Sequence, residues 1–474
     1  MRIIYSCLAL CLTAFNALAV TIESASGQLA SNISDKSITE LTVTGTINAV
    51  DFKFIADELT ALESLNLSGV TITAFSSTKA LFANARTFDD NTLPVGCFAN
   101  SALTSVTLPS SLSVIGEGAF LSCNGLTSIV IPESVDSIAP YAFSACEKLA
   151  TITIPASVRE IGTGAFSHCT SLASVTIEEN DEDLTIGDEA FYGCTALANA
   201  KLANRTKSIG KSAFCDCTNA SFTVVLGNAS RLSSIGESAF QNSGIKAFDF
   251  SRCPNLKVIP QYAFASSKLT SVSIPDNITF VAEGAFFNNA KLASIDLANN
   301  SASIAKLQFA GCNLAQNTGM TDQTTEVGEY AYYGWNQIEK LIIPENVSHI
   351  GDYAFGNMSQ LAKVTSMNPS APSLGEAVFS GVTPASVLLT TKIASTGYKD
   401  GDQWSEFMFT LNGDASNNGS INVNDITAII SHKKGKTPTN FLFEAADVNV
   451  DNVIDDSDIS DIVDIISNED ETEN

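Results

Sequence analysis

A short motif that returns about every 23 residues constrains this chain more than any other feature. Clear copies read IGEGAF at 115–120, IGTGAF at 161–166 and IGESAF at 235–240. The closing aromatic residue lies at positions 98, 120, 143, 166, 191, 214, 240, 264, 286, 309, 332, 355 and 379. A unit of this length cannot bury its apolar face alone, so it stacks on its neighbours. The period therefore predicts a solenoid with one repeat in each turn of the coil.

A second segment recurs between the copies of the motif. It reads LTSVTLP at 103–109, LTSIVIP at 126–132, LATITIP at 149–155, LTSVSIP at 269–275 and IEKLIIP at 338–344. Alternating apolar and polar residues are typical of a short, half-buried strand. One strand per turn predicts a parallel sheet along one face. Glycine at the second motif position permits a tight backbone turn, and the Ala-Phe pair points into the coil. We therefore expect a β-rich α/β solenoid.

The adjacent pair His168 and Cys169 raises the question of a nucleophile and its base. Cysteine recurs three residues after the aromatic in six copies, which indicates a small buried residue and not a nucleophile. His168 does not recur, so we expect it on a solvent-facing turn. Export permits disulfides, and the nine cysteines after position 19 leave two alternatives open. We favour a reduced, buried ladder over pairing between adjacent turns.

The consensus IGxxAFxxCxxLxxIxIPxxV is similar to the leucine-rich repeats of BspA-type bacterial surface proteins. The resemblance covers 77–383, about thirteen copies, and implies a right-handed coil. Residues 20–76 and 384–410 resemble the caps that cover the open ends of such coils, with Tyr398, Trp404 and Phe407 over the last turn. Three departures predict a local irregularity: Tyr332 in place of phenylalanine, a poor copy around Ala305, and no strand pattern near 318–325.

The ends of the chain differ from the repeats in composition. Residues 1–19 have the charged start, apolar run and small closing residues of a secretory signal peptide. No later segment is long and apolar enough to span a membrane. The net charge of −26 argues against nucleic acid as a partner. We expect an exported protein that is secreted, periplasmic or held at the cell surface.

The acidic C-terminal part carries two twelve-residue segments, DASNNGSINVND at 414–425 and DVNVDNVIDDSD at 447–458. Both place oxygen-bearing side chains at positions 1, 3, 5, 9 and 12, and position 7 offers a backbone carbonyl, which is a spacing typical of Ca²⁺ loops. The second segment has four carboxylates against two in the first, so we expect it to bind calcium more tightly. The predicted ligands are Asp414, Ser416, Asn418, Ser420, Asn422 and Asp425 in the first loop, and Asp447, Asn449, Asp451, Val453, Asp455 and Asp458 in the second.

An amphipathic helix is expected after each loop. Its apolar residues are Ile426, Ile429 and Ile430 after the first loop, and Ile459, Ile462, Val463 and Ile466 after the second. Two loop–helix pairs with aspartate at position 12 resemble a dockerin module over 411–467, followed by an acidic tail at 468–474. The resemblance implies docking onto a cohesin-like partner. Positions 10 and 11, Val423-Asn424 and Asp456-Ser457, differ from the Ser-Thr pairs of cellulosomal dockerins.

The sequence favours a binding protein over an enzyme. His168, His349 and His432 lack the spacing of metal ligands, and no phosphate loop or nucleophile elbow is present. The outward strand positions carry small hydroxyl residues and no aromatic residues, which suits a protein ligand better than a glycan. The BspA-type resemblance implies adhesion to a host matrix protein or another bacterial surface protein. Alternatively, the tail docks the chain into an extracellular bacterial assembly, or it serves only as a terminal cap.

Overall fold

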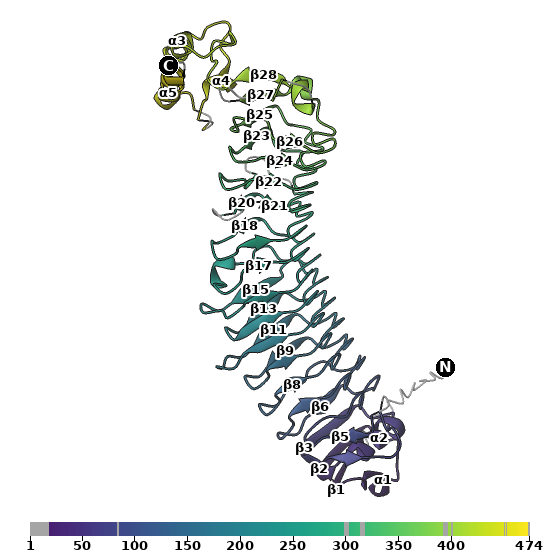
Figure 1. The fold of residues 1–474 in the computed structure, drawn as a ribbon. Coiled ribbons are helices and arrows are strands. Elements are labelled where there is room, and N and C mark those ends of the chain that lie inside the picture. Colours follow the sequence, from purple (N-terminus) through teal and green to yellow (C-terminus); the bar gives the residue numbers. More distant parts are fainter. Residues whose placement is uncertain are drawn as a thin grey trace, which may run out of the picture. The chain divides into compact units, whose positions relative to one another are not determined.

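The computed structural model describes residues 19–82, 85–297, 303–312, 318–391, 397–399, 402–449, 451 and 453–472. The expected signal peptide lies outside the described residues, apart from Ala19. The chain divides into two compact units, one ending at Leu172 and the other beginning at Ala173. Each unit contains stacked turns with short parallel strands (Figure 1). The predicted parallel β-solenoid is therefore confirmed.

The first unit begins with a cap that confirms the expected strand, helix and strand. Strand β2 (Glu40–Ile47) leads into helix α2 (Ala49–Glu58), and β3 (Ser64–Ile72) follows. The structure adds β1 (Ala19–Ser24), which pairs with β2, and the short helix α1 (Leu29–Asn32). Strand β3 pairs in parallel with β6 (Ser105–Thr107), so the cap sheet continues directly into the repeats. An antiparallel pair, β4 (Phe75–Ser76) and β5 (Thr87–Phe88), lies between them in sequence.

A buried carboxylate holds the cap together. Asp51 is 1% exposed and accepts backbone hydrogen bonds from Gly27 at 2.6 Å, Leu29 at 2.9 Å and Asn48 at 2.9 Å. Asn48 in turn caps α2 by accepting from the amide of Val50 at 2.9 Å. One side chain therefore joins the loop before α1 to the start of α2.

We expect Asp51→Ala to lower the free energy of unfolding of the cap by about 2–3 kcal/mol, because it leaves buried N–H groups without their acceptor. Hydrogen exchange at the amides of Gly27 and Leu29 measures this loss. The matched control is Asp57→Ala on the same helix, where an exposed ion pair with Lys53 contributes about 0.3–0.5 kcal/mol. Equal effects of the two substitutions would contradict the role given to Asp51.

The repeats form two columns of parallel strands where the sequence predicted one. The first column has the expected strands, such as β9 (Thr151–Ile154). The second column is built from the residues just before the motif glycine; in the first unit it comprises β7 (Val114–Ile115), β8 (Ser137–Ile138) and β10 (Glu160–Ile161). These strands are too short to show a periodic pattern, so sequence analysis missed them.

The second unit repeats both columns with interruptions. Its first column contains β11 (Ser174–Ile177), β13 (Asn199–Leu202), β15 (Thr223–Leu226), β18 (Ser271–Ser273), β20 (Ser294–Asp296), β23 (Lys340–Ile343) and β25 (Lys363–Ser366). Its second column contains β12 (Leu184–Ile186), β14 (Thr206–Ile209), β16 (Ser234–Ile235), β17 (Val258–Ile259), β19 (Phe280–Val281), β21 (Ser303–Ile304), β22 (Glu326–Val327), β24 (His349–Ile350) and β26 (Ser373–Leu374). A single 3-10 turn, η1 (Phe250–Arg252), replaces a strand between β16 and β17.

One expected strand is not formed. Residues 126–132 have no regular strand pairing, although Ile129 and Ile131 are buried and Val130 is 82% exposed. The alternation of apolar and polar residues therefore predicted correctly which side chains turn inward. It did not predict the hydrogen bonding, because pairing depends on neighbouring turns.

The motif phenylalanines form the expected ladder of buried rings. In the first unit the ring centroids of Phe98, Phe120, Phe143 and Phe166 follow one another at 5.2, 5.1 and 5.2 Å. The ladder of the second unit continues in the same way from Phe191 to Phe379, with Tyr332 as one of its rings. These buried rings make each turn depend on the next for its core.

The motif position requires glycine because neighbouring repeats lie very close together there. It does not require glycine because of a tight backbone turn within its own repeat. Gly162 and Gly236 do not have positive φ angles. A Cβ atom on Gly162 would lie 2.6 Å from the backbone nitrogen of Pro140, and one on Gly236 would lie 2.3 Å from that of Lys211. Neighbouring turns therefore approach each other more closely here than a side chain allows. This corrects the reason that the sequence suggested for the glycine.

The irregularity expected near 318–325 is present. Residues 318–325 contain no strand. The buried hydroxyl of Tyr332 donates a hydrogen bond to the backbone oxygen of Thr318 at 2.9 Å. Tyrosine therefore replaces phenylalanine at the turn where it satisfies a backbone group of the irregular segment.

The last turn is closed by the three aromatic residues that the sequence indicated. Tyr398, Trp404 and Phe407 are buried, and the rings of Trp404 and Phe407 lie 5.4 and 4.9 Å from that of Phe379. The segment consists of η3 (Pro384–Ser386), β27 (Leu388–Thr391), η4 (Gln403–Glu406) and β28 (Met408–Leu411). Strands β27 and β28 extend the sheet of β23 and β25.

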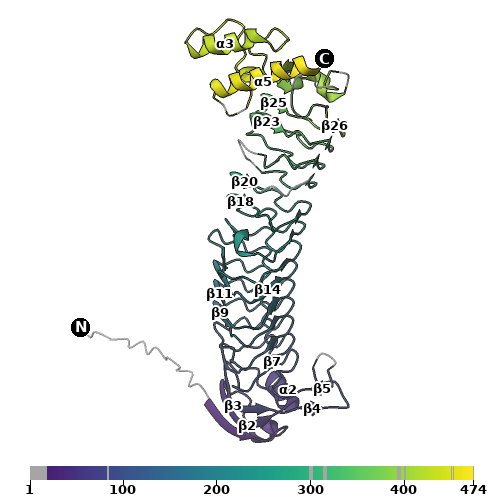
Figure 2. The ribbon, with the colours of Figure 1, turned by 60° about the vertical axis from the view of Figure 1, so that its left-hand side comes forward.

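The C-terminal part is a small helical module with its own core. Helices α3 (Val423–Lys433) and α5 (Asp456–Thr472) pack together (Figure 2). The short α4 (Phe443–Ala446) precedes the second loop (Figure 1). Helix α3 ends as expected, with Gly435 at a φ of +73° just beyond it. Ile429 and Ile462 are fully buried, whereas Ile430 and Val463 are exposed, which corrects their expected place on the apolar face.

Candidate functional site

The outward positions of the first strand column form an exposed surface in each unit. Every outward residue named from the sequence is exposed or half-buried, which confirms the predicted alternation. Most of them are serine or threonine, and none is aromatic. They are Ser105, Thr107, Ser128, Val130, Thr151 and Thr153 in the first unit, and Ser174, Thr176, Asn199, Lys201, Ser271, Ser273, Ser294, Asp296, Lys340 and Ile342 in the second.

His168 and Cys169 are not arranged as a catalytic pair. His168 is exposed and has a φ of +58°, a left-handed angle that the residue two places after the motif aromatic adopts in every copy. Cys169 is fully buried, and its Sγ donates a hydrogen bond to the backbone oxygen of Phe143 at 3.1 Å. The backbone turn therefore directs the two neighbouring side chains to opposite environments.

The buried cysteines are hydrogen-bond donors as well as small core residues. The Sγ atoms of Cys123, Cys146, Cys217 and Cys312 lie 2.9, 3.1, 3.2 and 3.2 Å from the carbonyl oxygen of a phenylalanine in the preceding turn. Asn289 Nδ2 and Trp335 Nε1 occupy the same position in their repeats and bond the equivalent oxygen at 2.8 and 2.7 Å. In these six repeats the side chain at this position donates a hydrogen bond to the preceding turn, which the recurrence of cysteine alone did not reveal.

Burial should make the cysteine thiols of the repeats unreactive in the folded protein. It raises the pKa of Cys215 and of Cys253 to about 11 and the pKa of Cys312 to about 12. Because the thiolate is the reactive form, we expect native protein near pH 8 to react with Ellman's reagent at least about tenfold more slowly than unfolded protein, whose thiols have a pKa of about 8.5. The native rate should rise as the pH approaches 11. In protein that lacks residues 1–19, fewer than nine reactive thiols after unfolding would instead indicate disulfides.

The first candidate calcium loop is closed by two buried aspartates. Asp414 and Asp425 are 1% and 0% exposed. Asp414 accepts hydrogen bonds from the backbone amides of Asn418 at 2.8 Å and Gly419 at 2.7 Å. Asp425 accepts from those of Ser416 and Asn422, both at 2.8 Å. The carboxylates at positions 1 and 12 therefore hold the loop closed by accepting hydrogen bonds from its backbone amides.

The second loop has an equivalent hydrogen-bond pattern. Asp458 accepts from the amide of Asp455 at 2.8 Å, as Asp425 does from Asn422. Asp451 accepts from the amide of Val453 at 2.7 Å, as Asn418 does from Ser420 at 3.0 Å. Asp447 and Asp458 are both buried, at 6% and 0% exposure. Two loops of different sequence therefore share hydrogen bonds at equivalent positions, and each leads into a helix.

The expected ligands of both loops carry the kind of atoms that a hard cation prefers. All ten ligating side chains expected from the sequence offer oxygen, and the module buries four carboxylates at positions 1 and 12 of the two loops. Calcium prefers such oxygen ligands. Within the described residues, no group of three or more His, Cys, Asp or Glu side chains is gathered as a metal cluster. The calcium assignment therefore stays a prediction that rests on the loops.

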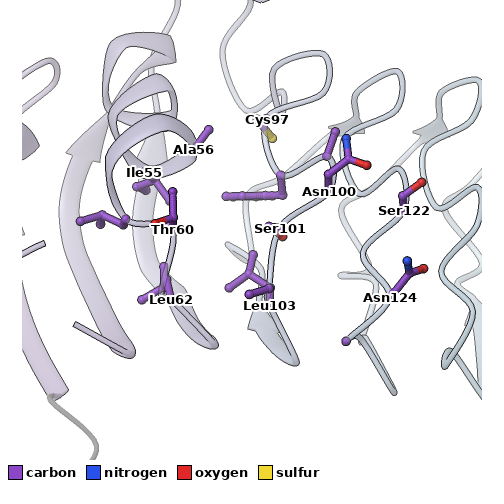
Figure 3. A pocket seen from close by; sticks show the side chains of 15 residues that line it. Ile55, Ala56, Thr60, Leu62, Cys97, Asn100, Ser101, Leu103, Ser122 and Asn124 are labelled. Carbon is purple, nitrogen blue, oxygen red and sulfur yellow. The ribbon is translucent and has the colours of Figure 1, made fainter. Parts of the chain in front are cut away.

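A cavity that the sequence did not reveal lies between the N-terminal cap and the first repeat turns. It has a volume of about 520 Å³ and is lined by fifteen residues, none of them charged (Figure 3). Ile55, Ala56, Thr60 and Leu62 approach it from α2 and the segment that follows, and Cys97, Asn100, Ser101 and Leu103 face them from the first repeat. Cys97 stands where most repeats have alanine before the aromatic. This copy, LPVGCF at 93–98, also departs from the motif at Leu93 and Pro94.

Comparison with known proteins identifies the repeats. Residues 91–221, 184–315 and 281–399 match the model of the BspA type leucine rich repeat region, with six copies. These matches cover more than half of the chain, which therefore belongs to this family. No curated protein matches the sequence.

Several solved structures resemble the chain. A leucine-rich repeat protein from Bacteroides ovatus is 18% identical, with a TM-score of 0.53 over 84% of this chain and 92% of that one. A leucine rich cell surface protein from Faecalibacterium prausnitzii is 23% identical, with a TM-score of 0.35 over 73% and 82% of the two chains. The first of these confirms the leucine-rich repeat fold. Among the described residues, no helix has the length and apolar character needed to cross a membrane.

Proposed function

We propose that this member of the BspA-type leucine-rich repeat family is a non-catalytic, exported binding protein that adheres to other proteins through its repeats. Leucine-rich repeat solenoids are typically protein-binding scaffolds, and BspA-type proteins are generally found at surfaces or secreted. The proposed ligand is a host matrix protein or another bacterial surface protein.

The exposed strand face carries this proposal. On β9, for example, Thr151 and Thr153 point outward while Ile152 and Ile154 are buried. Small uncharged side chains on a regular sheet leave its surface flat, which suits contact with a protein over a large area. In such an interface a few anchoring residues contribute most of the affinity.

The proposal is tested with the full chain and a panel of purified host extracellular-matrix proteins. We expect at least one to bind, and the double variant Thr151→Glu and Thr153→Glu to weaken that binding at least about tenfold, because two new charges would be desolvated. Thr185→Glu, on an exposed position of the second strand column, is the matched control and should bind normally. Failure of every matrix protein to bind would exclude a host matrix protein as the ligand.

A second candidate function is supported by the tail. The shared hydrogen-bond pattern of the two loops supports a calcium-dependent, dockerin-like module, which would attach the chain to a cohesin-like partner in an extracellular assembly. Here the chain would be offered the exported proteins of the producing cell, with calcium and with a chelator. Retention of a bacterial protein that is lost with the chelator and unaffected by Thr151→Glu would favour the assembly function over adhesion.

A further inference from the structure

The cavity at the seam between cap and repeats has the size and composition of a binding site. Its volume of about 520 Å³ lies within the range of about 300–1,000 Å³ that is usual for ligand pockets. Ile55, Leu62 and Leu103 are at most 4% exposed and form an apolar interior. Asn100 and Asn124 are exposed residues of its lining. The site therefore combines an apolar interior with hydrogen-bonding side chains at its opening.

The cavity arises because two different kinds of backbone meet at this seam. Helix α2 is broad, whereas the facing segment is a tight turn with Asn100 at a φ of +59°. The next repeat has the same kind of turn at Ser122, with a φ of +58°. The cavity therefore lies where the cap meets the repeats.

Two observations favour a peptide as the occupant. Leu62 and Leu103 lie two residues before β3 and β6, so the cavity adjoins the ends of strands whose outward side chains are small and polar. Asparagine offers both a donor and an acceptor, which match the C=O and N–H of a peptide group. The absence of charge in the lining excludes recognition by an ion pair.

We propose that this cavity binds a large apolar side chain of the protein partner, with Asn100 and Asn124 bonding the adjoining peptide backbone. The proposal rests on the proposed protein-binding function and assigns an anchoring pocket to it. A buried anchor of this kind contributes much of the affinity of an interface.

The test uses random short peptides displayed on phage and selected on the full chain. Selected peptides should share one large apolar residue, and its replacement by alanine should weaken binding at least about tenfold. Ala56→Trp fills the mouth of the cavity from an exposed position of α2 and should abolish binding. Ala61→Trp is the matched control, since Ala61 is exposed and lies outside the lining. Unfolding curves of both variants establish that they fold.

Peptides that bind the Ala56→Trp protein as well as the native one would overturn the proposal. Binding of the neutral dye Nile red with no peptide enriched would also overturn it, and would assign the cavity to a small molecule. A matrix protein that binds the Ala56→Trp variant normally would refute the anchor and leave adhesion intact. Peptide selection at the cavity without any matrix binding would refute adhesion to host matrix and leave the anchor intact.

Discussion

Replacement of Phe143 by alanine should lower the free energy of unfolding by about 3–5 kcal/mol, which is the usual loss for a buried phenylalanine. The ring is fully buried between those of Phe120 and Phe166, at 5.1 and 5.2 Å. Its removal leaves a cavity that two neighbouring turns line and that their closely packed backbones cannot fill. Denaturant unfolding followed by circular dichroism measures the loss.

Tyr141→Ala is the matched control for this substitution. Tyr141 lies two residues earlier in the same repeat but is 42% exposed. A surface substitution of this kind should change the free energy of unfolding by about 0.5 kcal/mol or less. Because each turn of a solenoid contacts chiefly its neighbours, Phe143→Ala should also reduce hydrogen-exchange protection first in residues 115–166. Equal losses for the two variants would show that the ring ladder does not hold the turns together.

Removal of calcium should unfold or loosen the C-terminal module. A ligand at about one hundred times its Kd contributes about 2.7 kcal/mol of stability at each site, and the four aspartates at positions 1 and 12 of the loops are buried. We expect a chelator to abolish hydrogen-exchange protection in α3 and α5 while protection in the repeats persists. Titration calorimetry should resolve two binding events, the tighter one at 447–458.

Asp451→Asn separates calcium binding from the folding of the loop. Asp451 is exposed and accepts a hydrogen bond from the Val453 amide at 2.7 Å, which an asparagine oxygen can also accept. The substitution removes one negative ligand, so calcium affinity at this loop should fall at least about tenfold while the calcium-free protein is unchanged. Asp464→Asn, on the exposed surface of α5 outside the loop, should have no effect. Unaltered calorimetry for Asp451→Asn would refute the assignment of this loop.

Much of the fold follows from the sequence because the repeat imposes its own register. The recurrence of Ala-Phe predicted the buried ladder, and the alternation in LATITIP predicted both β9 and its exposed threonines. The tail was predicted less completely. Ile429 and Ile462 are buried as expected, but helical spacing alone also assigned Ile430 and Val463 to the core. In this small module the face of each helix that is buried by its neighbours is narrower than the face that carries its apolar residues.

Other features depend on residues about one turn away along the chain, so they can be seen only in the folded protein. The motif glycine is required by the backbone of the preceding turn, and the cysteine thiols donate to carbonyl oxygens 25 or 26 residues earlier. The second strand column and the cavity beside α2 arise in the same way, from stacking and from the seam between unlike elements. The period, the inward-facing residues and the oxygen-rich loops can be predicted from the sequence alone, because these are local patterns. Contacts between turns have no local pattern, so only the folded chain reveals them.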